Sequence, residues 1–377
     1  MKIGIDIYSF IPDKNFGVGP TVYAYNLVKH LVEQNSGHDF VIFTNEANHI
    51  FFSPRPNCKI IKSKMPASKG ILRVIHEQIV LPFYFYREKL DVIHFTGNVI
   101  SFLLGRHSIL TVHDLMWKYY LKSDWVPLYK KIYYSVLCPR SFKLARRIVT
   151  VSNFIKGELE FEERVRPDKI FVIHEAHGLG PEVELTPEEI RELEKEYPPG
   201  FLFSVTTTWP HKNLIVLLKA LDWLQENKNF DRRLIVVGQN RLSNDEINRY
   251  LQENHLDHQF ISLGFVSDKE LKYFYSRAGV FIFPSLYEGF GLPLLEAMRM
   301  GVPVVASQAA SLPEIGKDAC LYADPHAPED FARQIHRLLE DENLRSEMIT
   351  RGKLREKQFS WDALARQTIC VYEHFKK

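Results

Sequence analysis

Short apolar runs recur along the whole chain, and the segments between them are long enough to hold a helix. Most runs are continuously apolar, which is typical of strands buried on both faces of a parallel sheet. They cover residues 2–7, 40–44, 58–61, 91–95, 109–112, 147–151, 169–173, 201–205, 234–238, 260–264, 280–283 and 302–306. The pattern therefore predicts two successive doubly wound α/β sheets, one in each half of the chain.

Chain length and helix start signals predict how the chain divides into domains. A chain of 377 residues fits two domains better than one core. The sequence turns polar after the run that ends at Ile173, and Thr186-Pro187 then begins a helix with proline in its first turn. We therefore predict a Rossmann-like domain of residues 1–175, a second of residues 176–360, and a terminal helix within residues 361–377.

Composition narrows the classes of partner. A net charge of +2 provides no overall attraction to nucleic acid, and no apolar run approaches the ~20 residues of a membrane span. Four cysteines without paired metal spacing favour a reducing cytoplasm. Residues 69–89 and 128–147 mix basic and aromatic side chains, as in helices with a solvated basic face or helices at the inner surface of the cytoplasmic membrane. We expect a cytoplasmic protein without nucleic-acid partners, with peripheral membrane contact as an open alternative.

Candidate chemistry concentrates after the apolar run at residues 280–283. Gly289 and Gly291 allow a tight turn there, and Pro293 suits the first turn of a following helix. The backbone N–H groups of Phe290, Gly291 and Leu292, around the start of that helix, would face the carboxyl end of the strand. A helix N-terminus in this position predicts an anion site.

Two glutamates flank this predicted anion site. Glu288 precedes the glycines, and Glu296 lies one turn into the helix. Each one alone suits an ordinary surface loop or helix cap equally well. Carboxylates repel a phosphate but accept hydrogen bonds from hydroxyl groups, so together they favour a ligand that carries both a phosphate and a sugar.

Two more residues occupy suggestive positions. Lys212 lies just before a helix predicted from Leu214, where a cation is unfavourable unless an anion binds beside it; an exposed loop lysine is the simpler interpretation. His113 follows the strand at residues 109–112, at the edge where parallel sheets bind ligands, although a single histidine is more often structural.

A glycine-containing loop follows the first strand. Gly17 and Gly19 permit close approach of a ligand to the backbone, and a flexible first crossover is the alternative. The loop is too long for a dinucleotide fingerprint and lacks its third glycine. A hydride-transfer dehydrogenase is therefore disfavoured.

The spacing from Glu288 through Gly-Phe-Gly-Leu-Pro to Glu296, followed by Ala-Met and Gly-Val-Pro-Val-Val-Ala-Ser, closely resembles the donor-site signature of the family 4 retaining glycosyltransferases, which belong to glycosyltransferase group 1. The resemblance implies the GT-B fold, in which two Rossmann-like domains face each other across a cleft. It assigns acceptor binding to residues 1–175 and donor binding to residues 176–360. It also implies that the C-terminal helix packs back on the first domain.

The resemblance further implies roles for single residues. Glu288 would lie against the transferred sugar, Glu296 would bind the ribose, and Lys212 would clamp the diphosphate. Glu288, His113 and Lys212 are the catalytic candidates. The other donor-binding candidates are Gly17, Gly19, Thr207, Thr208, Gly264, Phe265, Gly289, Phe290, Gly291, Leu292 and Glu296. One departure stands out, since Thr206 occupies the position where many members carry an arginine.

The implied reaction is transfer of a mannose- or glucose-type hexose, from a donor such as GDP-mannose or UDP-glucose, to a hydroxyl of a saccharide or lipid-linked saccharide. Cell-surface polysaccharide or lipopolysaccharide assembly is the expected setting. The chain has no Asp-x-Asp step, so we expect no metal and no cofactor beyond the donor itself. A sugar-nucleotide epimerase of the same architecture and a non-catalytic sugar-nucleotide sensor remain alternatives.

Overall fold

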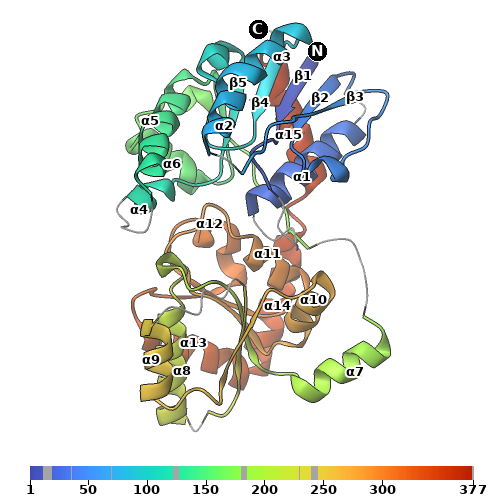
Figure 1. Cartoon of the computed structure of the whole chain (residues 1–377). Helices are drawn as coiled ribbons and strands as arrows, with labels where there is room; N and C mark the ends of the chain where they lie inside the picture. The colour runs from blue at the N-terminus through green and yellow to red at the C-terminus, as the bar shows by residue number, and fades with distance from the viewer. Residues whose placement is uncertain are drawn as a thin grey trace. The chain divides into compact units, whose positions relative to one another are not determined.

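The computed structural model describes residues 1–11, 19–34, 36–68, 70–121, 127–179, 185–228, 230–238 and 245–375. The chain divides into two compact units (Figure 1). Unit 1 comprises Met1–Glu175 together with Ser360–Lys377, and unit 2 comprises Ala176–Phe359.

Unit 1 is built on a seven-stranded sheet with all neighbouring strands parallel, in the order β3-β2-β1-β4-β5-β6-β7. The strand order reverses between β1 and β4, which makes their carboxyl ends the topological switch point of the sheet. Every strand predicted in this half is confirmed: β1 (Lys2–Asp6), β2 (Asp39–Thr44), β3 (Cys58–Lys62), β4 (Val92–Phe95), β5 (Ser108–Val112), β6 (Arg147–Thr150) and β7 (Ile170–Val172).

Helices connect these strands. They are α1 (Gly19–Glu33), α2 (Gly70–Ile75), the π-helix η2 (His76–Val80), α3 (Leu81–Arg87), α4 (Trp117–Leu121), α5 (Leu128–Leu144) and α6 (Asn153–Phe161), with short 3₁₀ turns η1 (His49–Phe51), η3 (Phe102–His107) and η4 (Pro167–Lys169). The sequence pattern did not predict the π-helix, which joins α2 to α3 without a break in the chain.

The C-terminal helix α15 (Trp361–Glu373) belongs to unit 1 and lies against α1, as the red helix among the blue elements of Figure 1. Buried hydrogen bonds secure it. The Tyr372 hydroxyl lies 2.8 Å from His94 Nδ1, and His94 Nε2 lies 2.7 Å from the Thr111 hydroxyl. Burial lowers the pKa of His94 to about 3, so its imidazole is neutral in this network.

Unit 2 contains a six-stranded parallel sheet in the order β10-β9-β8-β11-β12-β13. Its switch point lies between β8 and β11. The five predicted strands are confirmed as β8 (Leu202–Val205), β9 (Leu234–Val237), β10 (Phe260–Gly264), β11 (Val280–Phe283) and β12 (Val304–Ser307). The sixth, β13 (Leu321–Ala323), has only three residues and was not predicted.

The helices of unit 2 are α7 (Pro187–Glu196), α8 (Leu214–Lys228), α9 (Asp245–Glu253), α10 (Asp268–Arg277), α11 (Leu292–Arg299), α12 (Leu312–Gly316), α13 (Pro328–Glu340) and α14 (Glu342–Glu356), with 3₁₀ turns η5 (Pro210–Lys212) and η6 (Lys317–Ala319). The predicted start of α7 is confirmed by a capping box between Thr186 and Glu189. No helix in the described parts of the chain is both long and apolar enough to cross a membrane.

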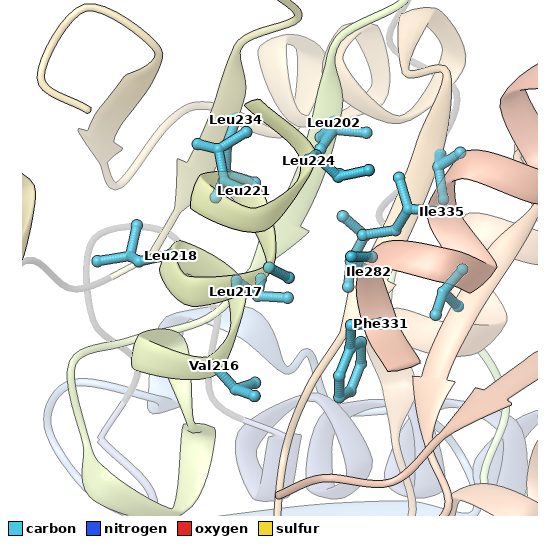
Figure 2. Close-up of a cluster of buried hydrophobic side chains, with 14 of the residues drawn as sticks. Leu202, Val216, Leu217, Leu218, Leu221, Leu224, Leu234, Ile282, Phe331 and Ile335 are labelled. Carbon is cyan, nitrogen blue, oxygen red and sulfur yellow. The ribbon is translucent and has the colours of Figure 1, made fainter. Parts of the chain in front are cut away.

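One face of the second sheet carries a large apolar core. Leu217 and Leu221 of α8 and Phe331 of α13 are buried over Ile282 of β11 (Figure 2). Burying each of these side chains contributes about 1.5–3 kcal/mol to folding. The core thus fixes the central strands β8 and β11, whose carboxyl ends carry the residues described next.

Candidate functional site

The switch point of unit 2 is formed by two loops that are bonded to each other. The Leu286 N–H, after β11, donates to the His211 carbonyl in η5 at 2.7 Å. The Asn213 side-chain amide donates to the carbonyls of Pro284 at 3.1 Å and Pro325 at 2.8 Å. Asn213 adopts a left-handed conformation with φ +56°, which asparagine tolerates better than most residues. These bonds hold the loops after β8 and β11, and the segment after β13, together at the carboxyl edge of the sheet.

Lys212 and Glu288 meet at this edge. Lys212 Nζ lies 2.6 Å from Glu288 Oε1, and the two side chains are 23% and 14% exposed. In this structure the anion beside Lys212 is therefore the carboxylate of Glu288, whereas the sequence pattern suggested only a ligand anion. The pair remains partly open to solvent, so one ligand can contact both charges.

The N-terminus of α11 adjoins Glu288. Gly291 caps the helix with φ +112°, a conformation that favours glycine, and a Cβ there would come within 3.0 Å of a Leu312 side-chain carbon. The buried Ser311 hydroxyl lies 2.9 Å from the Glu288 carbonyl oxygen and 2.8 Å from that of Phe290. The helix begins at Leu292 with Pro293 in its first turn, as predicted. Its positive end faces the same loop as Glu288.

Glu296 lies on the buried side of α11. The Tyr275 hydroxyl donates to Glu296 Oε2 at 2.8 Å. Burial raises the pKa of Glu296 to about 7, against the opposing effects of hydrogen bonds from Tyr275 and the Gly178 backbone. No hydrogen bond or ion pair found among the described residues joins Glu296 to Glu288, so the expectation that both flank one ligand stays a prediction.

The loop after β8 contains the threonines. Thr206 is buried, and a Cβ on Gly238, which has φ +140°, would overlap its carbonyl oxygen. Thr207 and Thr208 are partly exposed between β8 and η5, and Thr207 Oγ1 accepts from the Trp209 N–H at 3.4 Å. The position where many family members carry an arginine thus holds a buried side chain.

Gly264 and Phe265 lie at the end of β10. The Gly264 carbonyl accepts from the Gly238 N–H at 2.8 Å, and Gly264 has φ +68°. The Phe265 side chain is exposed. Of the two predicted glycines of the N-terminal loop, Gly19 is the first residue of α1, and Gly17 lies outside the described residues.

His113 follows β5 in unit 1, at the predicted strand end. Its Nε2 lies 3.0 Å from the Thr96 carbonyl oxygen, and its Nδ1 lies 3.1 Å from Glu175 Oε1. Burial alone would lower the pKa of His113, but the Glu175 carboxylate outweighs it and the pKa lies above the usual value. Both ring nitrogens are engaged within unit 1, so the role of His113 in reaching a ligand stays a prediction.

Three hydrogen-bond partners of the predicted site residues were not predicted from the sequence. Glu175, Tyr275 and Ser311 each contact a predicted site residue from another element. Glu175 lies 62 positions from His113, and no local pattern connects the two. Of the predicted residues, the structure brings together Lys212, Glu288, Gly289, Phe290, Gly291 and Leu292 in unit 2.

Comparisons with known proteins agree with this arrangement. The family model "Glycosyltransferase Family 4" matches residues 18–176, and "Glycosyl transferases group 1" matches residues 186–355. The chain is 32% identical over 269 residues to the O-antigen chain mannosyltransferase B of Escherichia coli, covering 71% of this chain and 70% of that protein.

Solved structures show the same fold. Sucrose-phosphate synthase from Thermosynechococcus elongatus matches with a TM-score of 0.75 at 20% identity, covering 99% of this chain and 98% of that one. Anabaena HepE in complex with UDP and glucose matches with a TM-score of 0.72 at 15% identity, covering 99% and 100%. The chain therefore belongs to the group 1, family 4 glycosyltransferases, and its two parallel α/β units have the GT-B fold.

Proposed function

We propose that the protein is a retaining hexosyltransferase that moves a sugar from a nucleoside diphosphate to a hydroxyl of a saccharide or lipid-linked saccharide. The observation that carries this proposal is the pair of Lys212 and Glu288, 2.6 Å apart at the switch point of unit 2 and beside the start of α11. A cation and a helix N-terminus suit a diphosphate, and a neighbouring carboxylate suits sugar hydroxyls.

The relatives favour particular donors and a setting. Similarity to an O-antigen mannosyltransferase favours GDP-mannose and a role in cell-surface polysaccharide or lipopolysaccharide biosynthesis. The structure of HepE holds UDP and glucose, but it shares only its fold with this chain. UDP-glucose is thus the second donor to examine.

The proposed reaction proceeds on one face of the sugar. The bond between the sugar C1 and the diphosphate oxygen breaks, and its electron pair stays on the diphosphate. Lys212 and the N-terminus of α11 stabilise that charge, which is the kind of preorganised electrostatic effect that contributes most in many enzymes. The acceptor oxygen attacks C1 from the same face, and its proton passes to the departing phosphate oxygen. Configuration is retained without a protein nucleophile, a metal or a further cofactor.

Donor binding changes the partners of Glu288 in this scheme. Lys212 turns from the Glu288 carboxylate towards the phosphates, because the diphosphate carries more negative charge than a single carboxylate. Glu288 is then free to accept hydrogen bonds from the transferred sugar. Glu296, on α11, accepts hydrogen bonds from the ribose hydroxyls of the donor. His113, held by its bonds to Thr96 and Glu175, positions the acceptor.

Membrane contact is a further part of the proposal. Ile71, Ile75, Ile79 and Phe83 are exposed at four-residue spacing along α2, η2 and α3, and Leu128, Ile132 and Val136 repeat this spacing on α5. Exposed Arg87 and Lys130 lie on the same segments, and exposed Lys89 follows the end of α3. Apolar stripes with basic neighbours suit an anionic membrane surface, which would bring the protein to a lipid-linked acceptor.

The test is release of nucleoside diphosphate from UDP-, GDP- and ADP-sugars in the presence of EDTA, with and without lipid-linked saccharide. We expect slow release from one donor, acceleration by acceptor, and loss of both in Glu288→Gln. Glu253→Gln, on an exposed position of α9, is the matched control and should behave as wild type. Interconversion of donor sugars without release would identify an epimerase, and binding without turnover would identify a sensor.

A further inference from the structure

The hydrogen bonds of His113 specify how many protons its ring carries. His113 directly follows β5, and Glu175 lies shortly after the end of β7. His113 Nδ1 lies 3.1 Å from Glu175 Oε1, and Nε2 lies 3.0 Å from the Thr96 carbonyl oxygen. An ionised carboxylate and a backbone carbonyl can only accept hydrogen bonds. Both ring nitrogens therefore have to donate, which the doubly protonated imidazolium does and a neutral imidazole cannot do.

The burial of Glu175 favours the same protonation state. Glu175 is 3% exposed and His113 is 8% exposed. In the part of the chain that the structure describes, His113 is the one hydrogen-bond and ion-pair partner found for the Glu175 carboxylate. A buried carboxylate without a compensating charge is strongly unfavourable. The imidazolium supplies that charge, so the pair as a whole is neutral.

The other groups around His113 leave this balance in place. The Tyr23 ring of α1 meets the imidazole nearly at right angles, with centroids 4.7 Å apart and planes at 82°. His94 of β4 is neutral, because burial lowers its pKa to about 3. Burial also lowers the pKa of His113, but the hydrogen bond and charge of Glu175, assisted by the charge of Asp114, outweigh it. The pKa of His113 therefore lies above its ordinary value.

The backbone holds both acceptors of the His113 ring in position. The N–H and hydroxyl of Thr96 donate to the Asp6 carbonyl at 3.3 and 2.7 Å. Near Glu175, the Ile173 N–H donates to the Thr150 carbonyl at 2.9 Å. The sheet thus fixes the two groups between which the imidazole lies, and the ring cannot turn without losing a hydrogen bond.

We propose that Glu175 is a positioning residue that keeps His113 as an imidazolium during sugar transfer. The proposal rests on the proposed function, in which His113 belongs to the transfer site, and it deepens that function by assigning a protonation state. An imidazolium has no lone pair with which to take a proton. His113 therefore acts as a fixed positive charge and not as a general base. The proton of the acceptor hydroxyl is left to the departing phosphate oxygen as the acceptor oxygen bonds to C1.

The first test needs no activity. Ring-nitrogen chemical shifts of His113 are followed against pH by long-range ¹H–¹⁵N NMR of the full chain labelled with ¹⁵N-histidine, with His113→Gln to assign the signals. We expect both nitrogens to be protonated in wild type at about pH 7, and Glu175→Gln to lower the pH of deprotonation by at least about one unit, or tenfold in acid dissociation constant. Glu175→Asp keeps a carboxylate and should lie between the two.

A matched control accompanies these variants. Glu192→Gln, at an exposed position of α7, removes the same charge elsewhere and should leave the titration of His113 as in wild type. Circular dichroism would establish that each variant is folded. The wild-type spectrum alone already tests the proton count, so the proposal does not depend on the stability of any variant.

The second test is the pH dependence of transfer at saturating donor and acceptor. We expect kcat to fall at alkaline pH as His113 loses its proton, and Glu175→Gln to move this fall to lower pH by at least about one unit. A purely structural role of Glu175 would lower kcat without moving the fall. A general base at His113 would instead give a rate that rises as the ring deprotonates.

Three results would overturn the proposal: an unprotonated His113 Nδ1 in wild type at about pH 7, a titration unchanged in folded Glu175→Gln, or a rate that rises with deprotonation of His113. Failure of the proposed function is a separate result. If wild type releases no nucleoside diphosphate from any donor, that function fails, and the NMR titration still decides whether Glu175 holds the second proton on His113.

Discussion

The two sheets have the same strand order around their switch points but opposite chemistry at them. In unit 2, Lys212 and Glu288 form a partly exposed ion pair beside the start of α11. In unit 1, Asp6 and Glu77 are buried, Glu77 pairs with Arg73, and His113 is bonded to Glu175. Topology thus selects where ligands bind, and local charge selects which ligands. The partly exposed pair of unit 2 is the one that we propose for a phosphate.

Removing the positive charge of Lys212 should have the largest effect on the rate of sugar transfer. Lys212→Met leaves the charge of the departing diphosphate to α11 alone, and we expect kcat to fall about 10²–10³-fold. Lys219→Met, at an exposed position of α8, is the matched control. The rate of nucleoside diphosphate release with saturating donor measures both. A kcat within threefold of wild type would remove Lys212 from the leaving-group site.

Distorting the sheet edge of unit 2 should affect stability strongly. A Cβ at Gly238 would overlap the Thr206 carbonyl, and φ +140° disfavours any other residue. We expect Gly238→Ala to lower the free energy of unfolding by about 3 kcal/mol or more, measured by urea denaturation. Gly157→Ala, in α6 with no atom near its added Cβ, should be neutral or slightly stabilising. Equal stability of both variants would contradict the geometry at Gly238.

Glu296 should make the stability of unit 2 depend on pH. Its folded pKa of about 7 lies above the unfolded value of 4.5, so the folded state binds a proton that the unfolded state releases. This contribution is fully present below pH 4.5 and is lost as pH rises to about 7, with a magnitude on the order of 3 kcal/mol. Glu296→Gln should therefore flatten the decline in Tm between pH 5 and 8. An unchanged decline would show that Glu296 ionises normally.

Membrane binding should depend on the exposed apolar stripe of unit 1. A substitution in that stripe should have the smallest effect of the variants considered. Ile79 is 64% exposed on the π-helix. We expect Ile79→Glu to reduce cosedimentation with anionic phosphatidylglycerol vesicles several-fold, because it places a negative charge in the apolar stripe. Leu354→Glu, at an equally exposed position of α14 in unit 2, is the control. Sedimentation of wild type no greater than without vesicles would exclude the contact.

Much of the fold was predictable because it depends on local apolar runs. Strands such as β5 and β11 are four or five buried residues between polar turns, and their patterns are visible in sequence. β13 was missed since three residues carry too little pattern, and the π-helix was missed because its residues keep a helical spacing.

The site was predictable only in part. Lys212 and Glu288 were each identified, but their ion pair spans 76 positions and arises from the adjacency of β8 and β11. Asp6 lies inside the apolar run at residues 2–7 and was not among the predicted site residues. Its neighbours Tyr8 and Glu77 come from two segments that only the folded sheet brings together. Long-range contacts of this kind have no signature in a single sequence.

The most direct measurement is the affinity of UDP and GDP for wild type, Glu288→Gln and Lys212→Met by isothermal titration calorimetry. Glu288 is paired with Lys212 in the unliganded protein, so Glu288→Gln should bind nucleotide as tightly as wild type or more tightly. Lys212→Met should weaken nucleotide binding about 10–100-fold. Equal weakening by both substitutions would contradict the exchange of Lys212 from Glu288 to the diphosphate. Nucleotide binding unaffected by Lys212→Met would place the donor elsewhere.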